Sequence, residues 1–178
     1  MISYEIALGL SFLGPIMMAG SMSLVDIVEA QNKTIWYVFP QILGFIIFTI
    51  AGLAEINRAP FDMPEAEQEL TAGYHSEYSG MKFALFFMAE YIKMIAISAI
   101  AVTLFLGGYS LPFVDDIGGW GPLVFLGKVI LFLFIIIWAR ATLPRFRYDR
   151  LMSFGWKILL PLALINVFGT AIVIVFTG

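Results

Sequence analysis

Two oppositely charged residues lie inside an otherwise apolar stretch of the sequence, and they are the first candidates for chemistry. Glu90 and Lys93 interrupt the hydrophobic run 83–106. A charged side chain near the centre of a bilayer is costly, so it must face water or the interior of a helix bundle and have a partner. Lys93 is the nearest candidate partner of Glu90, three residues further along a helix. Carboxylates placed in this way can bind or release a proton when neighbouring charge changes.

The composition indicates a membrane protein. Of 178 residues, 61% are hydrophobic and 13% are charged, and there is no Cys. An ordinary globular domain has about 25% charged residues, so a soluble fold of this chain would expose far more apolar surface than it could bury. Without Cys the chain can form no disulfide and hold no Cys-ligated iron–sulfur cluster. The net charge of −3, with no basic stripe, argues against nucleic-acid binding.

Charge-poor runs predict five transmembrane helices, since roughly 20 apolar residues cross about 30 Å of hydrocarbon. We therefore expect an all-α, polytopic membrane helix bundle that forms a single domain over residues 1–178. Lys128, inside the fourth span, is expected to snorkel outward and to have a weak role at most. The predicted spans cover about residues 4–25, 35–54, 81–106, 121–140 and 157–177.

Alternation of the spans determines which ionisable groups can meet. The connections at 55–82 and 140–157 lie on one side and carry most of the Lys and Arg, so the positive-inside rule places them in the cytoplasm or its equivalent. Glu5 begins the first helix on that side and Glu55 ends the second there. Glu90 lies about 12 Å deep in the third, at 1.5 Å per residue. The three carboxylates are therefore predicted to share the inner half of the bilayer.

Simpler explanations exist for each of these charges. Glu90 and Lys93 can be a buried ion pair without a further role, and Glu5 and Glu55 can contact lipid headgroups. The basic residues between 140 and 157 can be a topology signal that also contacts lipid phosphates. The functional alternative is a proton relay through the glutamates, whose protonation responds to neighbouring charge.

The connection 55–80 is acidic and interleaved with apolar and aromatic residues. The spacing of Asp62 and Glu65 is that of a capping box and favours a short helix over 64–70. A solvated loop is one interpretation, but the interleaved aromatic residues favour docking against another protein. His75 is the only His of the chain, which excludes a His-based metal site or a catalytic triad. The charged residues of this loop are Glu55, Arg58, Asp62, Glu65, Glu67, Glu69 and Glu77.

A family resemblance is carried by residues 55–91, which read EINRAPFDMPEAEQELTAGYHSEYSGMKFALFFMAEY. They resemble the signature of the quinone-chamber membrane subunit of respiratory complex I, in its bacterial and mitochondrial forms alike. Two further blocks are similar to the family, SYEIALG at 3–9 and WARATLPRFRYDRLMSFGWKILLPLALIN at 138–166. The resemblance covers nearly the whole chain and implies a core subunit of a proton-translocating NADH:quinone oxidoreductase.

The resemblance also implies roles for individual residues. Glu5, Glu55 and Glu90 match acids of a carboxylate path from the quinone cavity towards antiporter-like subunits, and Tyr91 falls within the matching block. Lys93 joins this predicted relay as the expected partner of Glu90. The acidic loop is expected to pack against the peripheral arm beside the cavity where quinone is reduced. The loop residues expected at that interface are Arg58, Asp62, Glu65, Glu67, Glu69, His75 and Glu77.

Cofactors and partners follow from the same resemblance. The chain is expected to have no redox centre, metal or bound cofactor and to be inactive alone. Quinone is the expected substrate at the interface, with NADH, FMN and iron–sulfur clusters in partner subunits. The expected location is the bacterial plasma membrane or the mitochondrial inner membrane, with the acidic loop on the cytoplasmic or matrix side.

The chain departs from the family in one respect, and other functions stay open. Family members match it only from about their middle onward, so we expect either a fragment or a split subunit whose front half is a separate chain. One alternative function is the equivalent subunit of a membrane-bound energy-converting hydrogenase, against which the PEAEQELTAGYHSEYSG stretch argues. The others are a free-standing proton transporter and a structural membrane anchor.

Overall fold

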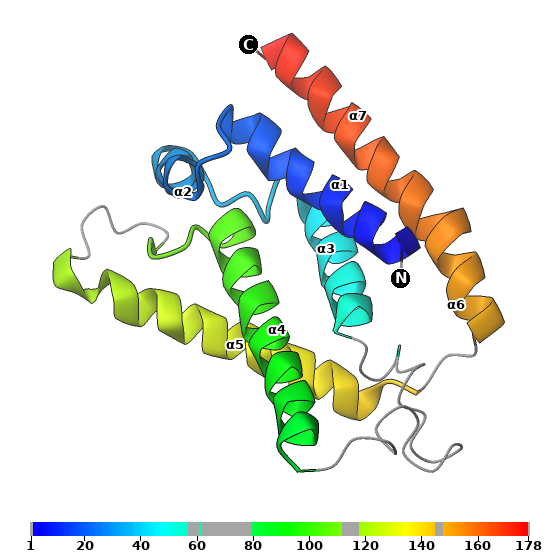
Figure 1. The fold of residues 1–178 in the computed structure, drawn as a ribbon. Coiled ribbons are helices and arrows are strands. Elements are labelled where there is room, and N and C mark those ends of the chain that lie inside the picture. Colours follow the sequence, from blue (N-terminus) through cyan, green and yellow to red (C-terminus); the bar gives the residue numbers. More distant parts are fainter. Residues whose placement is uncertain (1, 57–60, 62–79, 112–117, 145–147, 178) are drawn as a thin grey trace.

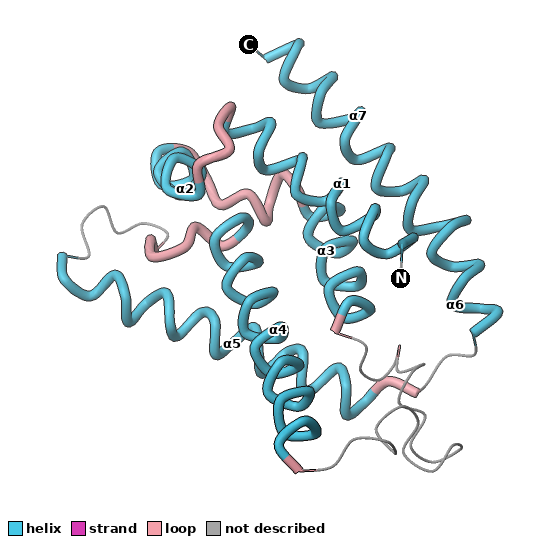
Figure 2. The backbone as a smooth tube through the Cα atoms, in the orientation of Figure 1, coloured by secondary structure: helices cyan, strands magenta, loops and turns pink. Residues whose placement is uncertain are grey.

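The computed structural model describes residues 2–56, 61, 80–111, 118–144 and 148–177, and the regular elements within them are all helices (Figures 1 and 2). Two short turns, the 3-10 turn η2 (Gly118–Trp120) and the π-helical turn η3 (Gly155–Leu159), join longer helices. The α-helices are α1 (Ile2–Ala19), α2 (Leu24–Lys33), α3 (Ile42–Glu55), α4 (Met81–Phe105), α5 (Gly121–Thr142), α6 (Tyr148–Phe154) and α7 (Leu160–Thr177).

Several of these helices are suited to a bilayer, which makes the chain an all-helical integral membrane protein. Among the described residues, three helical segments are long and apolar enough to span it: Met81–Phe105, Gly121–Thr142 and Arg150–Phe176. The pair α1 and α2 is a fourth candidate, bent by 58° at its break. Helix α3 is apolar but has only 14 residues. The described residues therefore contain three or four candidate spans, whereas the sequence predicts five.

The first predicted span, 4–25, ends early because Gly20 stops α1. Gly20 has a φ of 68°, a left-handed conformation that glycine adopts without strain, and its N–H bonds to the carbonyl of Ile16 at 2.9 Å. Ser23 then caps a new helix, since its hydroxyl accepts a hydrogen bond from the N–H of Asp26 at 3.5 Å. The segment between the first two predicted spans therefore contains helix α2, where the sequence suggested a simple connection.

The second predicted span, 35–54, starts late, at Ile42. Pro40 has no backbone N–H to donate, and the preceding peptide groups are bonded elsewhere. The N–H of Tyr37 donates to Oε1 of Gln31 at 3.3 Å, and the N–H of Val38 donates to the carbonyl of Phe105 at 3.0 Å. This segment is thus tied to the ends of α2 and α4 and does not extend α3.

Phenylalanine rings hold the centre of the bundle, where α1, α3, α4 and α5 meet. Phe48 of α3 lies 5.5 Å from both Phe12 of α1 and Phe105 of α4, measured between ring centroids. Phe45, one turn earlier in α3, lies 5.4 Å from Phe105 and 5.9 Å from Phe132 of α5. Tilted and edge-on pairs of this kind each contribute about 0.5–1.5 kcal/mol beyond their buried area. Helix α3 is therefore the central element of the core despite its short length.

The last helical segment, which runs from α6 through η3 to α7, contains a widened turn. Within η3 the N–H of Leu160 bonds to the carbonyl of Gly155, five residues earlier. The next residue, Pro161, cannot donate a hydrogen bond and its ring crowds the preceding turn, which accounts for the local loosening. Helix α7 continues beyond it and packs along α1 (Figure 1).

Two glycines of α1 provide a matched test of the packing. A Cβ added at Gly14 would lie 2.6 Å from Oε1 of the buried Gln41 side chain, whereas one added at Gly9 meets nothing within 4 Å. Gly14→Ala should therefore destabilise the protein by about 1–3 kcal/mol through overpacking. Gly9→Ala should be neutral or stabilising by up to about 1 kcal/mol, because alanine favours helix. Thermal unfolding midpoints in detergent compare the two variants, and equal midpoints would contradict this packing.

Candidate functional site

An ion pair joins the end of α3 to the middle of α4. The ammonium of Lys93 donates to Oε1 of Glu55 at 2.9 Å and to the backbone carbonyl of the same residue at 3.2 Å. Lys93 is 48% exposed and Glu55 is 22% exposed, so the lysine has room to move and the carboxylate has less. The second contact also neutralises part of the negative end of α3. The partner of Lys93 here is Glu55, on another helix, although the sequence spacing pointed to Glu90.

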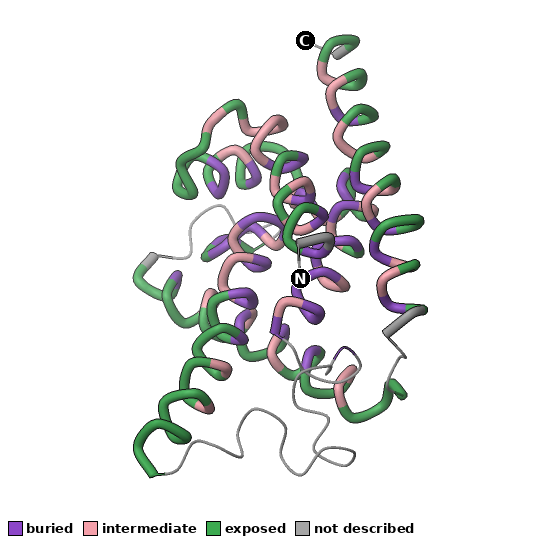
Figure 3. The backbone as a smooth tube through the Cα atoms, turned by 45° about the vertical axis from the view of Figure 1, so that its right-hand side comes forward, coloured by how far each residue is buried: buried purple, intermediate pink, exposed green. Residues whose placement is uncertain are grey.

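Glu90 and Tyr91 lie one turn before Lys93 on α4. Glu90 is half-buried, whereas Tyr91 is 53% exposed. The first half of α4 is exposed along most of its length, as the exposed lower part of this helix shows in Figure 3. These two residues therefore stand on the part of α4 that is least covered by the described chain.

Glu5 lies at the start of α1, beside an anchored tyrosine. Glu5 itself is exposed, while Tyr4 is buried and donates its hydroxyl to the carbonyl of Leu151 in α6 at 2.7 Å. The Tyr4 ring also lies 5.9 Å from that of Phe61. Since α1 and α3 are antiparallel, Glu5 and Glu55 belong to the same end of this helix pair. The structure thus joins Glu55 to Lys93 directly and places Glu5 on a neighbouring helix.

An apolar pocket lies at this same end of the bundle. It has a volume of about 330 Å³ and is bordered by Leu53 near the end of α3, by Phe61, and by Leu151 and Phe154 of α6. Arg150 also borders the pocket, whose lining is almost wholly apolar. A pocket of this kind suits an apolar group. Within the described residues, no group of three or more His, Asp or Glu side chains could hold a metal ion.

The predicted interface loop falls outside the described residues. The structure describes only Phe61 between residues 57 and 79. The loop positions predicted from the sequence are therefore not placed: Arg58, Asp62, Glu65, Glu67, Glu69, His75 and Glu77.

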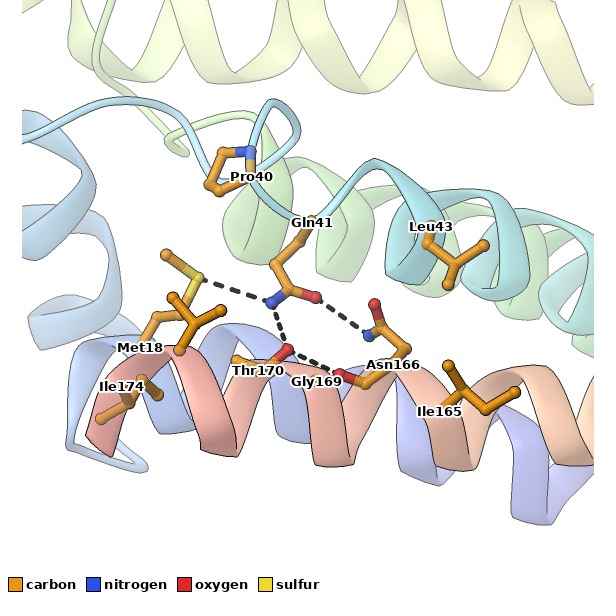
Figure 4. Close-up of a pocket in the computed structure, with 10 residues that line it drawn as sticks. Met18, Pro40, Gln41, Leu43, Ile165, Asn166, Gly169, Thr170 and Ile174 are labelled. Atoms are coloured by element: carbon orange, nitrogen blue, oxygen red, sulfur yellow. Dashed lines mark hydrogen bonds between the residues drawn. The ribbon is translucent and has the colours of Figure 1, made fainter. Parts of the chain in front are cut away.

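Sequence reasoning missed a buried amide cluster between α1, α3 and α7. Gln41, 4% exposed, donates from Nε2 to Oγ1 of Thr170 at 2.6 Å and to Sδ of Met18 at 3.6 Å. Asn166 donates from Nδ2 to Oε1 of Gln41 at 2.9 Å (Figure 4). A cavity of about 530 Å³ lies beside this cluster. Polar residues in otherwise apolar helices are the signal that could have found it, since a bilayer forces such groups to bond to one another.

Lys128 was also misjudged from the sequence. It reaches towards the end of its span, as snorkelling predicts, but its ammonium ends on backbone carbonyls of the turn that follows α4. The sequence offers no direct signal for this contact, because the bonded groups are main-chain atoms about 20 residues earlier.

These features define an integral membrane protein in which an ion pair joins two neighbouring helices. A family model described as NADH dehydrogenase matches residues 1–171, and the chain belongs to this family. The chain is 56% identical over 172 residues to the NADH-quinone oxidoreductase H subunit of Protochlamydia amoebophila, covering 96% of this chain and 51% of the relative.

Other relatives give the same result. The corresponding NADH-quinone oxidoreductase proteins of Thermomicrobium roseum and Geobacillus kaustophilus are 52% identical over 181 residues and 51% identical over 183 residues. Each alignment covers 97% of this chain, and 52% and 51% of the respective relative. The chain therefore spans about half the length of the curated relatives it matches.

A double-mutant cycle tests the ion pair at this site. Glu55→Gln and Lys93→Gln should each destabilise the protein, and the double variant should lose less than their sum. The expected coupling is about 0.5–1 kcal/mol, because Lys93 is half exposed and such pairs are weak. The same cycle with Lys82→Gln, which lies on the exposed start of α4, should show no coupling. Equal coupling in both cycles, measured from thermal midpoints, would contradict a specific Glu55–Lys93 interaction.

Proposed function

We propose that this chain forms part of the membrane subunit of an NADH:quinone oxidoreductase and couples quinone reduction to proton translocation. The family membership and the names of the relatives support the first half of this proposal. The observation that carries the second half is the Glu55–Lys93 ion pair, which joins two helices one turn away from Glu90. An ion pair with a movable lysine, next to a further carboxylate, is suited to moving charge.

The lysine provides a physical link between the two glutamates. When Glu55 is ionised, its carboxylate holds Lys93 at 2.9 Å. When Glu55 takes up a proton, Lys93 loses its negative partner there, and its half-exposed side chain can turn towards Glu90, three residues away on the same face of α4. Protonation of one acid thus changes the charge next to the other.

The remaining expectations complete the proposal. Glu5 and Tyr91 belong to the same relay, and the acidic loop 55–80 lies on the cytoplasmic or matrix side against the peripheral arm. The chain has no redox centre, so electrons reach quinone through FMN and iron–sulfur clusters in partner subunits. Antiporter-like subunits receive the relay. Five spans, with α3 as a short one, fit this arrangement.

Glu90→Gln in the assembled complex is the direct test. The substitution keeps the shape and the hydrogen-bonding capacity but removes the proton-binding group. Quinone-dependent proton pumping in sealed vesicles should fall by about tenfold or more, the range expected when a positioned proton-transfer group is removed. Glu29→Gln, the same chemical change on an exposed residue of α2, is the matched control and should leave pumping unchanged.

Two outcomes would contradict the proposal. Unchanged pumping in Glu90→Gln removes that residue from the relay. Full activity after simultaneous neutralisation of Glu5, Glu55 and Glu90, in a complex that still assembles, would reduce the chain to a membrane anchor.

A further inference from the structure

A lysine from α5 donates hydrogen bonds to backbone carbonyls at the end of α4. Nζ of Lys128 donates to the carbonyls of Leu106 at 2.6 Å and of Gly108 at 3.1 Å, and also to the carbonyl of Ser110. The same nitrogen lies 4.2 Å from the ring centroid of Trp36. An ammonium has three N–H donors, so these three carbonyls use all of them. The aromatic ring adds a cation–π contact on a further side.

A glutamine from α2 bonds to the same end of α4. Gln31 is 2% exposed, and its Nε2 donates to the carbonyl of Thr103 at 3.0 Å. Its Oε1 accepts from the N–H of Gly107 at 3.0 Å and from that of Tyr37 at 3.3 Å. We refer to Gln31 and Lys128 together as the α4 clamp.

The α4 clamp bonds to backbone groups at a helix end that carries a partial negative charge. The last carbonyls of an α-helix have no intrahelical donors, and together they carry a partial negative charge. Gly107 and Gly108 then turn the chain with positive φ angles of 70° and 54°. Gly107, Gly108 and Ser110 are buried, so the carbonyls of this turn need hydrogen-bond donors from within the protein. A lysine is the stronger choice because its positive charge also offsets the helix dipole.

Among the described residues, the buried packing of helix α4 lies mainly at this end. Its buried residues all lie in its second half, from Met94 to Phe105, whereas residues 81–93 are almost all exposed (Figure 3). The helix has neither Gly nor Pro between Met81 and Phe105, so it lacks the usual sites of a kink. Lys93 lies about 18 Å from Phe105 along the axis, at 1.5 Å per residue. A small tilt at the clamped end therefore moves Lys93 relative to α3.

We propose that Gln31 and Lys128 are positioning residues that set the direction of α4 and thereby hold Lys93 against Glu55. Neither residue touches Lys93 or Glu55. They hold one end of the stiff helix α4, and the Glu55–Lys93 ion pair lies towards the other end of the α3–α4 pair. The effect on helix position stands independently of the proposed function, and the effect on proton pumping rests on it.

A disulfide between α3 and α4 reports the position of the helix. A Cβ added at Gly52 would lie 3.0 Å from Cγ2 of Ile97, so Gly52→Cys with Ile97→Cys places two thiols next to each other, one turn from the ion pair. The chain has no Cys of its own, so the crosslink is unique within it. The rate of its formation under mild oxidant is measured in the assembled complex by mass spectrometry of the non-reduced peptides.

The expected order of crosslinking rates follows from the lost contacts. Lys128→Met should slow the reaction at least about fivefold, since a charge-assisted hydrogen bond is worth roughly a factor of ten in an equilibrium. Lys128→Arg, which keeps the charge and the donors, should restore most of the rate. Val129→Ala is the control for a general loosening of the packing, because it leaves a cavity at the buried residue next to Lys128 in α5. It should leave the crosslinking rate unchanged.

Each contrary result overturns the proposal. A Lys128→Met protein that crosslinks at the parental rate shows that the clamp does not position α4. If Lys128→Met does not accumulate in membranes, Lys128→Gln is measured instead, and a parental rate there has the same meaning. Equal slowing by Val129→Ala shows a general packing effect.

A second cycle connects the clamp to pumping. If Lys128 acts through Lys93, then Lys128→Met and Lys93→Gln together should reduce quinone-dependent pumping no more than the stronger single variant. Losses that multiply show that Lys128 acts by another route and overturn the link to Lys93. Unchanged pumping in Lys93→Gln instead refutes its role in the proposed function, while the crosslinking result remains a separate test of the clamp.

Discussion

Buried peptide groups at the breaks between these helices must find hydrogen-bond partners within the protein, and much of the architecture follows from that constraint. After α2 and α4, backbone groups bond to some of these carbonyls and N–H groups, and side chains bond to others. Gln31 and Lys128 bond to those near the end of α4, and each comes from a different helix. These bonds tie α2 and α5 to the end of α4, because a buried polar group without a partner is costly.

The amide cluster around Gln41 applies the same physics to helix packing. Apolar faces alone provide little preference between helix partners in lipid, so packing and hydrogen bonds must choose among them. Gln41 bonds to α1 and α7 at once, and Asn166 completes the contact. Gly14 and Gly44 leave the space for these side chains, as a Cβ at either position would come within 3.0 Å of an amide atom. Small residues and buried amides therefore act together at one helix junction.

Much of the fold could be predicted from the sequence, and the exceptions have physical reasons. Hydropathy alone indicates an all-helical membrane protein, since runs of apolar residues without charges have no other stable solution. The breaks at Gly20 and Pro40 were missed, although both residue types disfavour continuation, because a count of apolar residues does not register them. Most of the acidic loop lies outside the described residues, so the interface residues predicted there stay predictions.

The site was harder to predict than the fold. Sequence spacing favours Glu90 as the partner of Lys93, because residues three apart on a helix are neighbours. The structure brings Glu55 to Lys93 from another helix, 38 residues earlier, and no local pattern encodes that meeting. Gln31 was overlooked, and Lys128 was expected to have a weak role at most, for a related reason. Their partners are main-chain atoms, which every residue carries and no motif marks.

The widened turn before α7 has a geometric consequence for the cluster at Gln41. A π-helical turn adds one residue to the helix without ending it, and each residue rotates the helix face by about 100°. The extra residue brings Leu151, whose carbonyl accepts the Tyr4 hydroxyl, closer in phase with Asn166 and Thr170 further along the segment. Without the widened turn, these positions would face more divergent directions around the helix axis. One misfit turn thus aligns two distant stretches of the segment towards the same side.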